Sequence, residues 1–162
     1  MSRQISSNSS SIRTSTVDIA RAVLLTAELW AELRSKGNTK IGAAVYHNPS
    51  GQMFFGYNGF PSGVEDTEER WSTAAKHFFL VHAEENAILK AVAAIGLDLG
   101  ACELICTMLP CGGCLRKIAS CKIRKVYYSD SHADMLKSED AILRQQLIEE
   151  ANISIERINR GL

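Results

Sequence analysis

Several features are missing from this chain, and each absence narrows what the chain can be. Its 18 lysines and arginines equal its 18 aspartates and glutamates, so it lacks the basic excess of a dedicated nucleic-acid binder. No apolar run is long enough to span a bilayer, and the N-terminus lacks the apolar core of a secretory signal peptide. We therefore expect a cytoplasmic protein that has neither a membrane nor a nucleic acid as its partner.

Cysteine is also missing from the first half of the chain. The five cysteines lie close together, from Cys102 to Cys121. An odd number in one cluster suits a reducing compartment and a metal site better than a disulfide framework.

The length of 162 residues is enough for one domain with a full core. Residues 1–15 are rich in serine and poor in large apolar side chains, which predicts a flexible N-terminal tail. Residues 16–162 are then expected to form a single domain.

The apolar pattern predicts helices that alternate with strands. A first helix is expected to begin after an N-cap at Thr16 and to end at Gly37–Asn38. Its apolar residues share one face, namely Val17, Ala20, Val23, Leu24, Ala27, Trp30 and Leu33. Residues 64–79 give an ambiguous pattern that suggests a loop with a short helix. Strands are expected at residues 41–46, 53–57, 104–108, 125–129 and 153–158, and further helices at 83–95, 111–120 and 138–151.

This order predicts an α/β fold in three layers, α/β/α, with a mixed five-stranded sheet between helices. The first two strands would form an antiparallel hairpin, and strands joined through helices would be parallel neighbours. The helix at 83–95 is apolar on nearly all sides, which predicts burial. The inner face of the helix at 138–151 is expected to carry Ile142, Leu143, Leu147 and Ile148.

Two short motifs combine residues that could hold a catalytic zinc ion. They are His-Ala-Glu at 82–84 and Pro-Cys-Gly-Gly-Cys at 110–114. A catalytic zinc has three protein ligands and one open position for water, and His82, Cys111 and Cys114 would supply the three. Glu84 would be the catalytic proton shuttle, because zinc lowers the pKa of bound water to about 7 and a nearby carboxylate can move its protons.

Each motif alone has an ordinary explanation. A Cys-x-x-Cys pair is more often a structural zinc pair or a redox pair, and a lone histidine is more often a packed or solvent-facing residue. The two motifs together form H-x-E…P-C-x-x-C, the signature of zinc nucleobase deaminases. A structural site would have no use for Glu84.

From about residue 30 to about residue 158, the chain resembles the cytidine/deoxycytidylate deaminase superfamily, most closely its deoxycytidylate (dCMP) deaminase branch. The segment 82–88, HAEENAI, is similar to the branch's HAExNAI block, and 110–114 matches its PCxxC. GYNGFPSG at 56–63 is similar to GYNGxPxG, and RSKGNTKIGA at 34–43 is similar to RSKxxNxxVGA. The resemblance implies a cytidine-deaminase-like fold and one zinc ion per chain.

The resemblance also implies which residues bind substrate. Asn58 would contact the deoxyribose, and Ser35, Lys36 and Asn38 would lie near the nucleotide phosphate. Its remaining substrate-binding positions are Ala83 and Pro110. Some members bind a second, structural zinc after GYNG, but no cysteine precedes Cys102 here, so we expect no such site.

The implied reaction is hydrolytic deamination of dCMP to dUMP and ammonia, which supplies dUMP for dTMP synthesis. Family members are often homohexamers that dCTP activates, with magnesium, and dTTP inhibits. Other readings stay open at this point: a deaminase of dCTP or of a modified dCMP, the pyrimidine deaminase of riboflavin synthesis, a tRNA adenosine deaminase, or a zinc-bound module without catalysis.

Overall fold

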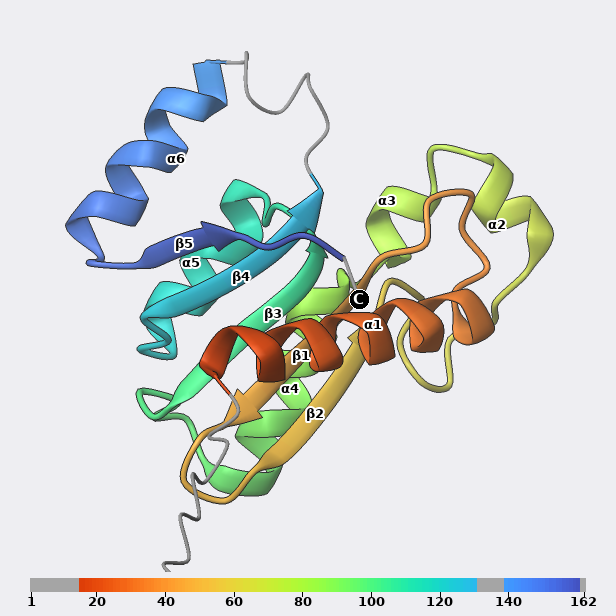
Figure 1. The fold of residues 1–162 in the computed structure, drawn as a ribbon. Coiled ribbons are helices and arrows are strands. Elements are labelled where there is room, and N and C mark those ends of the chain that lie inside the picture. Colours follow the sequence, from red (N-terminus) through yellow and green to blue (C-terminus); the bar gives the residue numbers. More distant parts are fainter. Residues whose placement is uncertain (1–14, 131–138, 161–162) are drawn as a thin grey trace, which may run out of the picture.

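The computed structural model describes residues 15–130 and 139–160, and its centre is a five-stranded sheet (Figure 1). The predicted tail at residues 1–15 falls almost wholly outside these described residues. The strands are β1 (Gly42–His47), β2 (Gln52–Tyr57), β3 (Cys102–Met108), β4 (Lys125–Asp130) and β5 (Ser154–Arg157), in the sheet order β2-β1-β3-β4-β5.

The sheet is mixed, as predicted, but one neighbour differs from the expectation. β1 pairs antiparallel with β2 and also with β3, while β3, β4 and β5 run parallel to one another. β3 follows β2 through a helix, yet it lies beside β1 instead of β2. The expectation of parallel neighbours was therefore wrong at this point, because the hairpin places β1 between the two strands.

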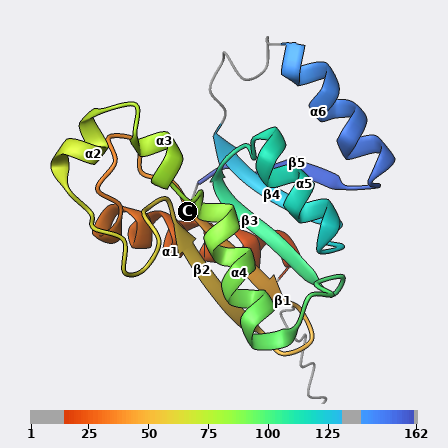
Figure 2. The same cartoon turned by 180° about the vertical axis from the view of Figure 1, so that it is seen from behind.

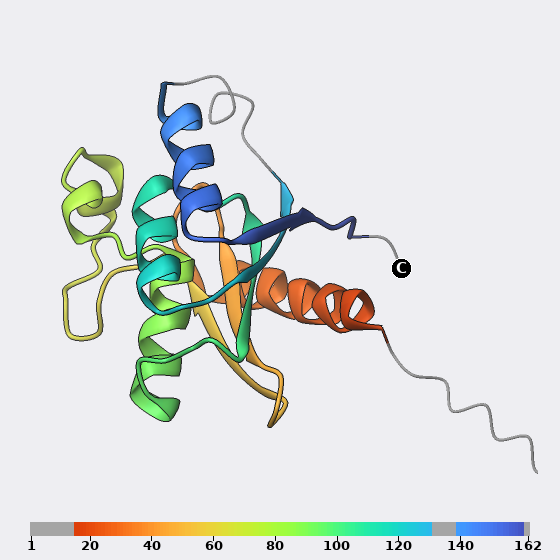
Figure 3. The same cartoon turned by 90° about the vertical axis from the view of Figure 1, so that its left-hand side faces the viewer.

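Helices cover both faces of the sheet, so the predicted three-layer α/β/α fold is confirmed (Figure 3). The helix α1 (Thr16–Arg34) covers one face. On the other face lie α4 (Ala83–Ile95), α5 (Gly112–Ser120) and α6 (Glu139–Glu150). The view from behind shows α4 and α5 in front of the strands (Figure 2). Two short helices, α2 (Glu68–Ser72) and α3 (Lys76–Phe79), replace the single short helix expected between β2 and α4.

The ends of α1 differ from the sequence prediction. Ser15, not Thr16, is the N-cap: its hydroxyl accepts a hydrogen bond from the Asp18 N–H at 3.1 Å, and the Asp18 carboxylate accepts one in return from the Ser15 backbone. The helix ends at Arg34, before Gly37–Asn38, because Ser35 adopts an extended conformation.

The inner faces of three helices were predicted only in part. α1 packs through Ala20, Val23, Leu24, Ala27 and Ala31, whereas Trp30 and Leu33 are exposed. In α6, Leu147 and Ile148 pack on the core, while Ile142 and Leu143 are exposed. α4 is not buried on all sides, since Leu89 is 56% exposed. In each of these helices, the apolar residues extend around more of the helix than the part that packs on the rest of the molecule.

Two glycines allow helices to approach the sheet closely. A Cβ on Gly42 would lie 2.0 Å from the Ala27 carbonyl oxygen of α1. A Cβ on Gly56 would lie 2.2 Å from the Ala83 carbonyl oxygen and 2.5 Å from the Ala87 nitrogen of α4. Since real Cβ atoms do not come this close, both positions require glycine for the helices to pack where they do.

α4 is also fastened to β2, the strand at one edge of the sheet. The Asn86 side-chain amide donates a hydrogen bond to the Tyr57 carbonyl at 2.7 Å, and the Lys90 ammonium donates one to the Phe55 carbonyl at 2.6 Å. Gly56 and these two hydrogen bonds together set the position of the first turns of α4.

Within residues 15–130 and 139–160, no helix has both the length and the apolar character that crossing a bilayer requires.

Candidate active site

The three predicted metal ligands come together at the starts of two helices. His82 is the N-cap of α4, Cys111 is the N-cap of α5, and Cys114 lies in the first turn of α5. The Nδ1 atom of His82 is 3.6 Å from the sulfur of Cys111 and 3.6 Å from the sulfur of Cys114. All three candidate ligand atoms lie within 4.8 Å of one another.

These separations fit a zinc ion. Zinc bonds of about 2.3 Å to sulfur and about 2.0 Å to nitrogen, at tetrahedral angles, separate the two atoms by about 3.5 Å. The two observed sulfur–nitrogen distances of 3.6 Å are close to this value. Two sulfurs and one imidazole nitrogen are also a ligand set that zinc prefers.

The charges at the site favour a thiolate. Hydrogen bonds donated by Cys114 and His82 lower the pKa of Cys111 to about 3. The hydrogen bond with Cys111 in turn raises the pKa of His82, and it raises that of Cys114. Both cysteines also lie where helix N-termini carry partial positive charge, which stabilises thiolates further. The site can therefore present the deprotonated sulfur that a metal requires.

Glu84 lies in the first turn of α4, two residues after His82, and is only 4% exposed. Burial raises the pKa of its carboxyl group above the ordinary range. A general acid–base group works best when its pKa is near the operating pH, so this shift suits a residue that takes and returns protons.

The other three cysteines are separate from this cluster. Cys102, Cys106 and Cys121 are buried as free thiols, and burial raises the pKa of each. Such neutral thiols behave as small apolar core residues.

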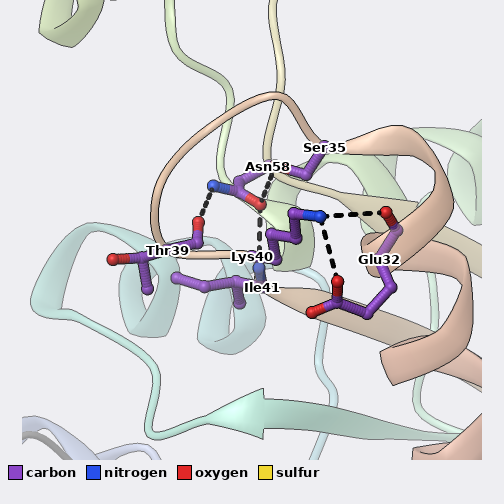
Figure 4. Close-up of polar contacts among 6 residues, drawn as sticks. All are labelled: Glu32, Ser35, Thr39, Lys40, Ile41 and Asn58. Atoms are coloured by element: carbon purple, nitrogen blue, oxygen red, sulfur yellow. Dashed lines mark hydrogen bonds and ion pairs between the residues drawn. The ribbon is translucent and has the colours of Figure 1, made fainter.

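Asn58 and Ser35, both predicted to bind substrate, form an internal hydrogen-bond network (Figure 4). The Asn58 side-chain oxygen accepts hydrogen bonds from the Ser35 hydroxyl and the Ile41 N–H, each at 2.8 Å. The Asn58 amide donates to the Thr39 carbonyl at 2.8 Å. Both residues are 6% exposed. Asn58 thus closes the loop between α1 and β1, and one of its two amide hydrogens is left for another partner.

The same loop carries the other two predicted phosphate contacts. The Lys36 ammonium lies 3.2 Å from the Asp66 carboxylate and 3.4 Å from the Asp66 carbonyl oxygen, so its charge is already shared. Asn38 is exposed. A neighbouring ion pair between Lys40 and Glu32, at 2.9 Å, fastens the loop to α1 (Figure 4).

Ala83 and Pro110 lie beside the ligands, one directly after His82 and one directly before Cys111. Both are buried. Their predicted contacts with substrate remain predictions, and their position next to the ligands is compatible with that role.

A cavity of about 220 Å³ lies against this loop. Lys36, Asn38 and Asn58 line it, as do Lys76, His77 and Trp71 from the α2–α3 segment. No sequence motif pointed to these last three residues. Helices of five and four residues are too short to show a periodic pattern, and a lone Trp or Lys-His pair has no motif.

A second cavity, of about 410 Å³, meets Cys111 from the side of α6. Arg116, Arg144 and Leu143 are among its lining residues. The cavity beside α6 therefore borders one of the three candidate ligands, whereas the cavity beside the α1–β1 loop is lined by none of them.

Comparison with known proteins agrees with this geometry. Residues 18–130 match the family described as the cytidine and deoxycytidylate deaminase zinc-binding region. A probable deoxycytidylate deaminase of Caenorhabditis elegans is 33% identical over 108 residues, which are 64% of this chain and 53% of that protein. An uncharacterized deaminase in the luxG 3′ region of Aliivibrio fischeri is 33% identical over 132 residues, or 80% of this chain and 86% of that protein.

A solved structure of a deoxycytidylate deaminase is also similar to this chain. The crystal structure of dCMP deaminase from the cyanophage S-TIM5, in complex with dCMP and dUMP, is similar with a TM-score of 0.68 and 27% identity. The match covers 90% of this chain and 100% of the phage chain.

The chain spans about half the length of the nematode relative. The family match nevertheless extends from α1 to β4 and includes every ligand in the cluster. A His/Cys/Cys cluster at two helix starts, on a mixed sheet of this order, thus agrees with the sequence matches: the chain belongs to the cytidine and deoxycytidylate deaminase family, in its deoxycytidylate deaminase branch.

Proposed function

We propose that this chain catalyses the zinc-dependent hydrolytic deamination of dCMP, in which dCMP and water give dUMP and ammonia. The observation that carries the proposal is the convergence of the His82 Nδ1 atom with two cysteine sulfurs at 3.6 Å, together with a buried carboxylate two residues after the histidine. The nematode relative named a probable deoxycytidylate deaminase, and the phage structure with dCMP and dUMP, support this choice of substrate.

His82, Cys111 and Cys114 would hold one zinc ion per chain. Bound zinc would supply an ionised water nucleophile at neutral pH. Glu84 would accept the proton that the attacking water loses and deliver it to the ring nitrogen next to the reacting carbon. It would then take the remaining proton from the newly added hydroxyl and pass it to the amino group, which leaves as ammonia while the carbonyl of dUMP forms. Its raised pKa suits both halves of this cycle, because the group must be protonated after the first transfer and ionised before the next turnover.

The other residues predicted to bind substrate have two proposed roles, namely holding the α1–β1 loop and contacting the substrate. Ser35 and Asn58 would act by holding the α1–β1 loop in place, with one Asn58 amide hydrogen available to the deoxyribose. Lys36, Asn38, Ala83 and Pro110 remain proposed substrate contacts. Residues 16–162 would form the deaminase domain. Assembly into a hexamer, and regulation by dCTP and dTTP with magnesium, stay predictions that light scattering and titration with each nucleotide can check.

A substrate screen tests the proposal. The purified, zinc-loaded protein is given dCMP, dCTP, 5-modified dCMP, deoxycytidine, adenosine and tRNA, and ammonia release is measured. The proposal expects dCMP to give the highest kcat/KM. If another of these compounds is deaminated and dCMP is not, the proposed substrate is wrong while the deaminase chemistry stands.

A further inference from the structure

The cavity beside the α1–β1 loop carries positive charge without carboxylates. Lys36, Lys76 and His77 line it, and no aspartate or glutamate is among the described residues that do so. Its volume of about 220 Å³ is below the range of about 300–1,000 Å³ that holds a whole drug-sized ligand. The cavity therefore suits one charged part of a substrate.

The two lysines in this cavity differ in how they are paired. Lys36 shares its charge with Asp66, whose carboxylate is 3.2 Å away. Lys76 is partly buried, and across residues 15–130 and 139–160 its ammonium has neither an ion pair nor a hydrogen bond. An ammonium that lines a cavity and has no protein anion can form charge-assisted hydrogen bonds with an anionic group of a ligand, and these are among the strongest hydrogen bonds in proteins.

Lys76 is held in place relative to the metal ligands. The ring of Phe79 packs on Phe60, with centroids 5.7 Å apart, and Phe60 stacks on Trp71 at 4.7 Å. A two-way backbone pairing between Gly59 and Val81, with hydrogen bonds of 3.1 and 2.9 Å, then leads directly into His82. Lys76 and the metal-ligating histidine therefore belong to one braced segment.

The geometry points to Lys76, assisted by the His77 imidazole, as the group that binds the 5′-phosphate of the substrate and selects nucleotides over nucleosides. This inference rests on the function proposed above and assigns the phosphate to a residue outside every motif in the sequence. Lys36 contributes less, because Asp66 already compensates its charge.

The test compares dCMP with deoxycytidine, which lacks only the phosphate. In Lys76→Met, kcat/KM for dCMP should fall about 10- to 100-fold, the effect of losing a hydrogen bond to a charged group. Activity on deoxycytidine should not change, and Lys76→Arg should recover most of the loss. Lys36→Met should reduce kcat/KM for dCMP by a smaller factor.

Two further variants control the comparison. Lys122→Met removes an exposed lysine that pairs with Asp98 at 2.6 Å and lines neither cavity, so it should leave both activities unchanged. Arg116→Met removes a cation from the cavity on the α6 side. If Arg116→Met lowers the preference for dCMP and Lys76→Met does not, the phosphate binds on the other side and the inference is wrong.

Failure of the inference can be told from failure of the proposed function. If the unchanged protein deaminates some cytosine compound but not dCMP, the proposed function fails. If it deaminates dCMP and Lys76→Met keeps the unchanged ratio of dCMP to deoxycytidine activity, only the inference fails. Calorimetric titration of dCMP into zinc-loaded Glu84→Gln, with and without Lys76→Met, measures the same contact without turnover and should show the same loss of affinity.

Discussion

Glu84 is a buried carboxylate next to a metal-ligand cluster that does not include it. The change Glu84→Gln keeps the size of the side chain and removes its ability to exchange protons. We expect kcat to fall by at least about 10²–10⁴-fold, the usual contribution of one acid–base group. Zinc content, measured by atomic absorption, should stay at one ion per chain. Substantial remaining turnover would contradict the proton-shuttle role.

Cysteine substitutions separate the metal ligands from the core thiols. Cys111→Ala and Cys114→Ala each remove one of three ligands, so zinc and activity should be lost together. Cys121→Ala is the matched control, since its thiol is buried and lies outside the cluster. It should keep zinc and cost about 1 kcal/mol in the free energy of unfolding. Zinc loss in the control, or zinc retention in Cys111→Ala, would require another ligand set.

Substitution of Asn58 shows whether this side chain mainly stabilises the loop between α1 and β1 or mainly binds the substrate. Asn58→Ala leaves the Ile41 N–H, the Thr39 carbonyl and the Ser35 hydroxyl without their partner. We expect the free energy of unfolding, measured in urea, to drop by about 1–3 kcal/mol or more. If stability is unchanged and KM for dCMP alone rises, Asn58 acts by contacting the substrate.

For single residues, the sequence predicted the metal ligands and the proton shuttle better than it predicted which side chains pair with one another. His82, Glu84, Cys111 and Cys114 were selected because their spacing identifies a reaction, and the structure brings the three metal ligands together. The pairing of Lys36 with Asp66 could not be foreseen, since it depends on where the loop after β2 returns. Lys76 was missed for the same reason: its role depends on a cavity formed by two distant segments.

Among the elements, α4 depends most on its contact with β2. Gly56→Ala would place a methyl group 2.2 Å from the Ala83 carbonyl oxygen, between the residues His82 and Glu84. The first turn of α4 must then shift, so we expect reduced zinc affinity and a lower kcat. Zinc affinity is measured by titration with a zinc indicator, and kcat is measured by turnover at saturating substrate.

Gly42→Ala is the matched control for this effect. It clashes equally severely, but with the Ala27 carbonyl oxygen of α1 on the opposite face of the sheet. It should lower the thermal midpoint while affecting zinc affinity less than Gly56→Ala does. Equal effects of the two changes on zinc affinity would show that Gly56 acts through general stability.

Element boundaries followed the sequence closely where local signals were strong. The predicted helix at 83–95 agrees with α4 in the structure, because an abrupt start and Gly96 mark its ends. The neighbour of β3 was not predictable, since nothing local distinguishes insertion beside β1 from addition beside β2. The exposed Ile142 and Leu143 show a related limit, because an apolar stripe does not reveal how much of it a neighbour covers.

For the whole molecule, the three proposed ligands would connect the starts of two helices, α4 and α5. The proposed zinc ion would bind only the folded chain, because the unfolded chain does not bring the three ligands together, so removal of the ion should lower stability. We expect a chelator to lower the thermal midpoint, and added zinc to restore it. Cys114→Ala should start from the lower midpoint and should not respond to the chelator. An equal response in that variant would mean that the chelator acts elsewhere.

The fastening of α4 to β2 also limits how copies of this chain can associate. An edge strand with unpaired carbonyl groups can template further strands and lead to aggregation. Here the Tyr57 and Phe55 carbonyls already accept hydrogen bonds from Asn86 and Lys90, and the Lys90 charge lies over the Tyr57 ring at 6.0 Å. An incoming strand would have to displace an amide and bury an ammonium. The same contacts that position the first turns of α4 therefore also hinder the pairing of a further strand at this edge of the sheet.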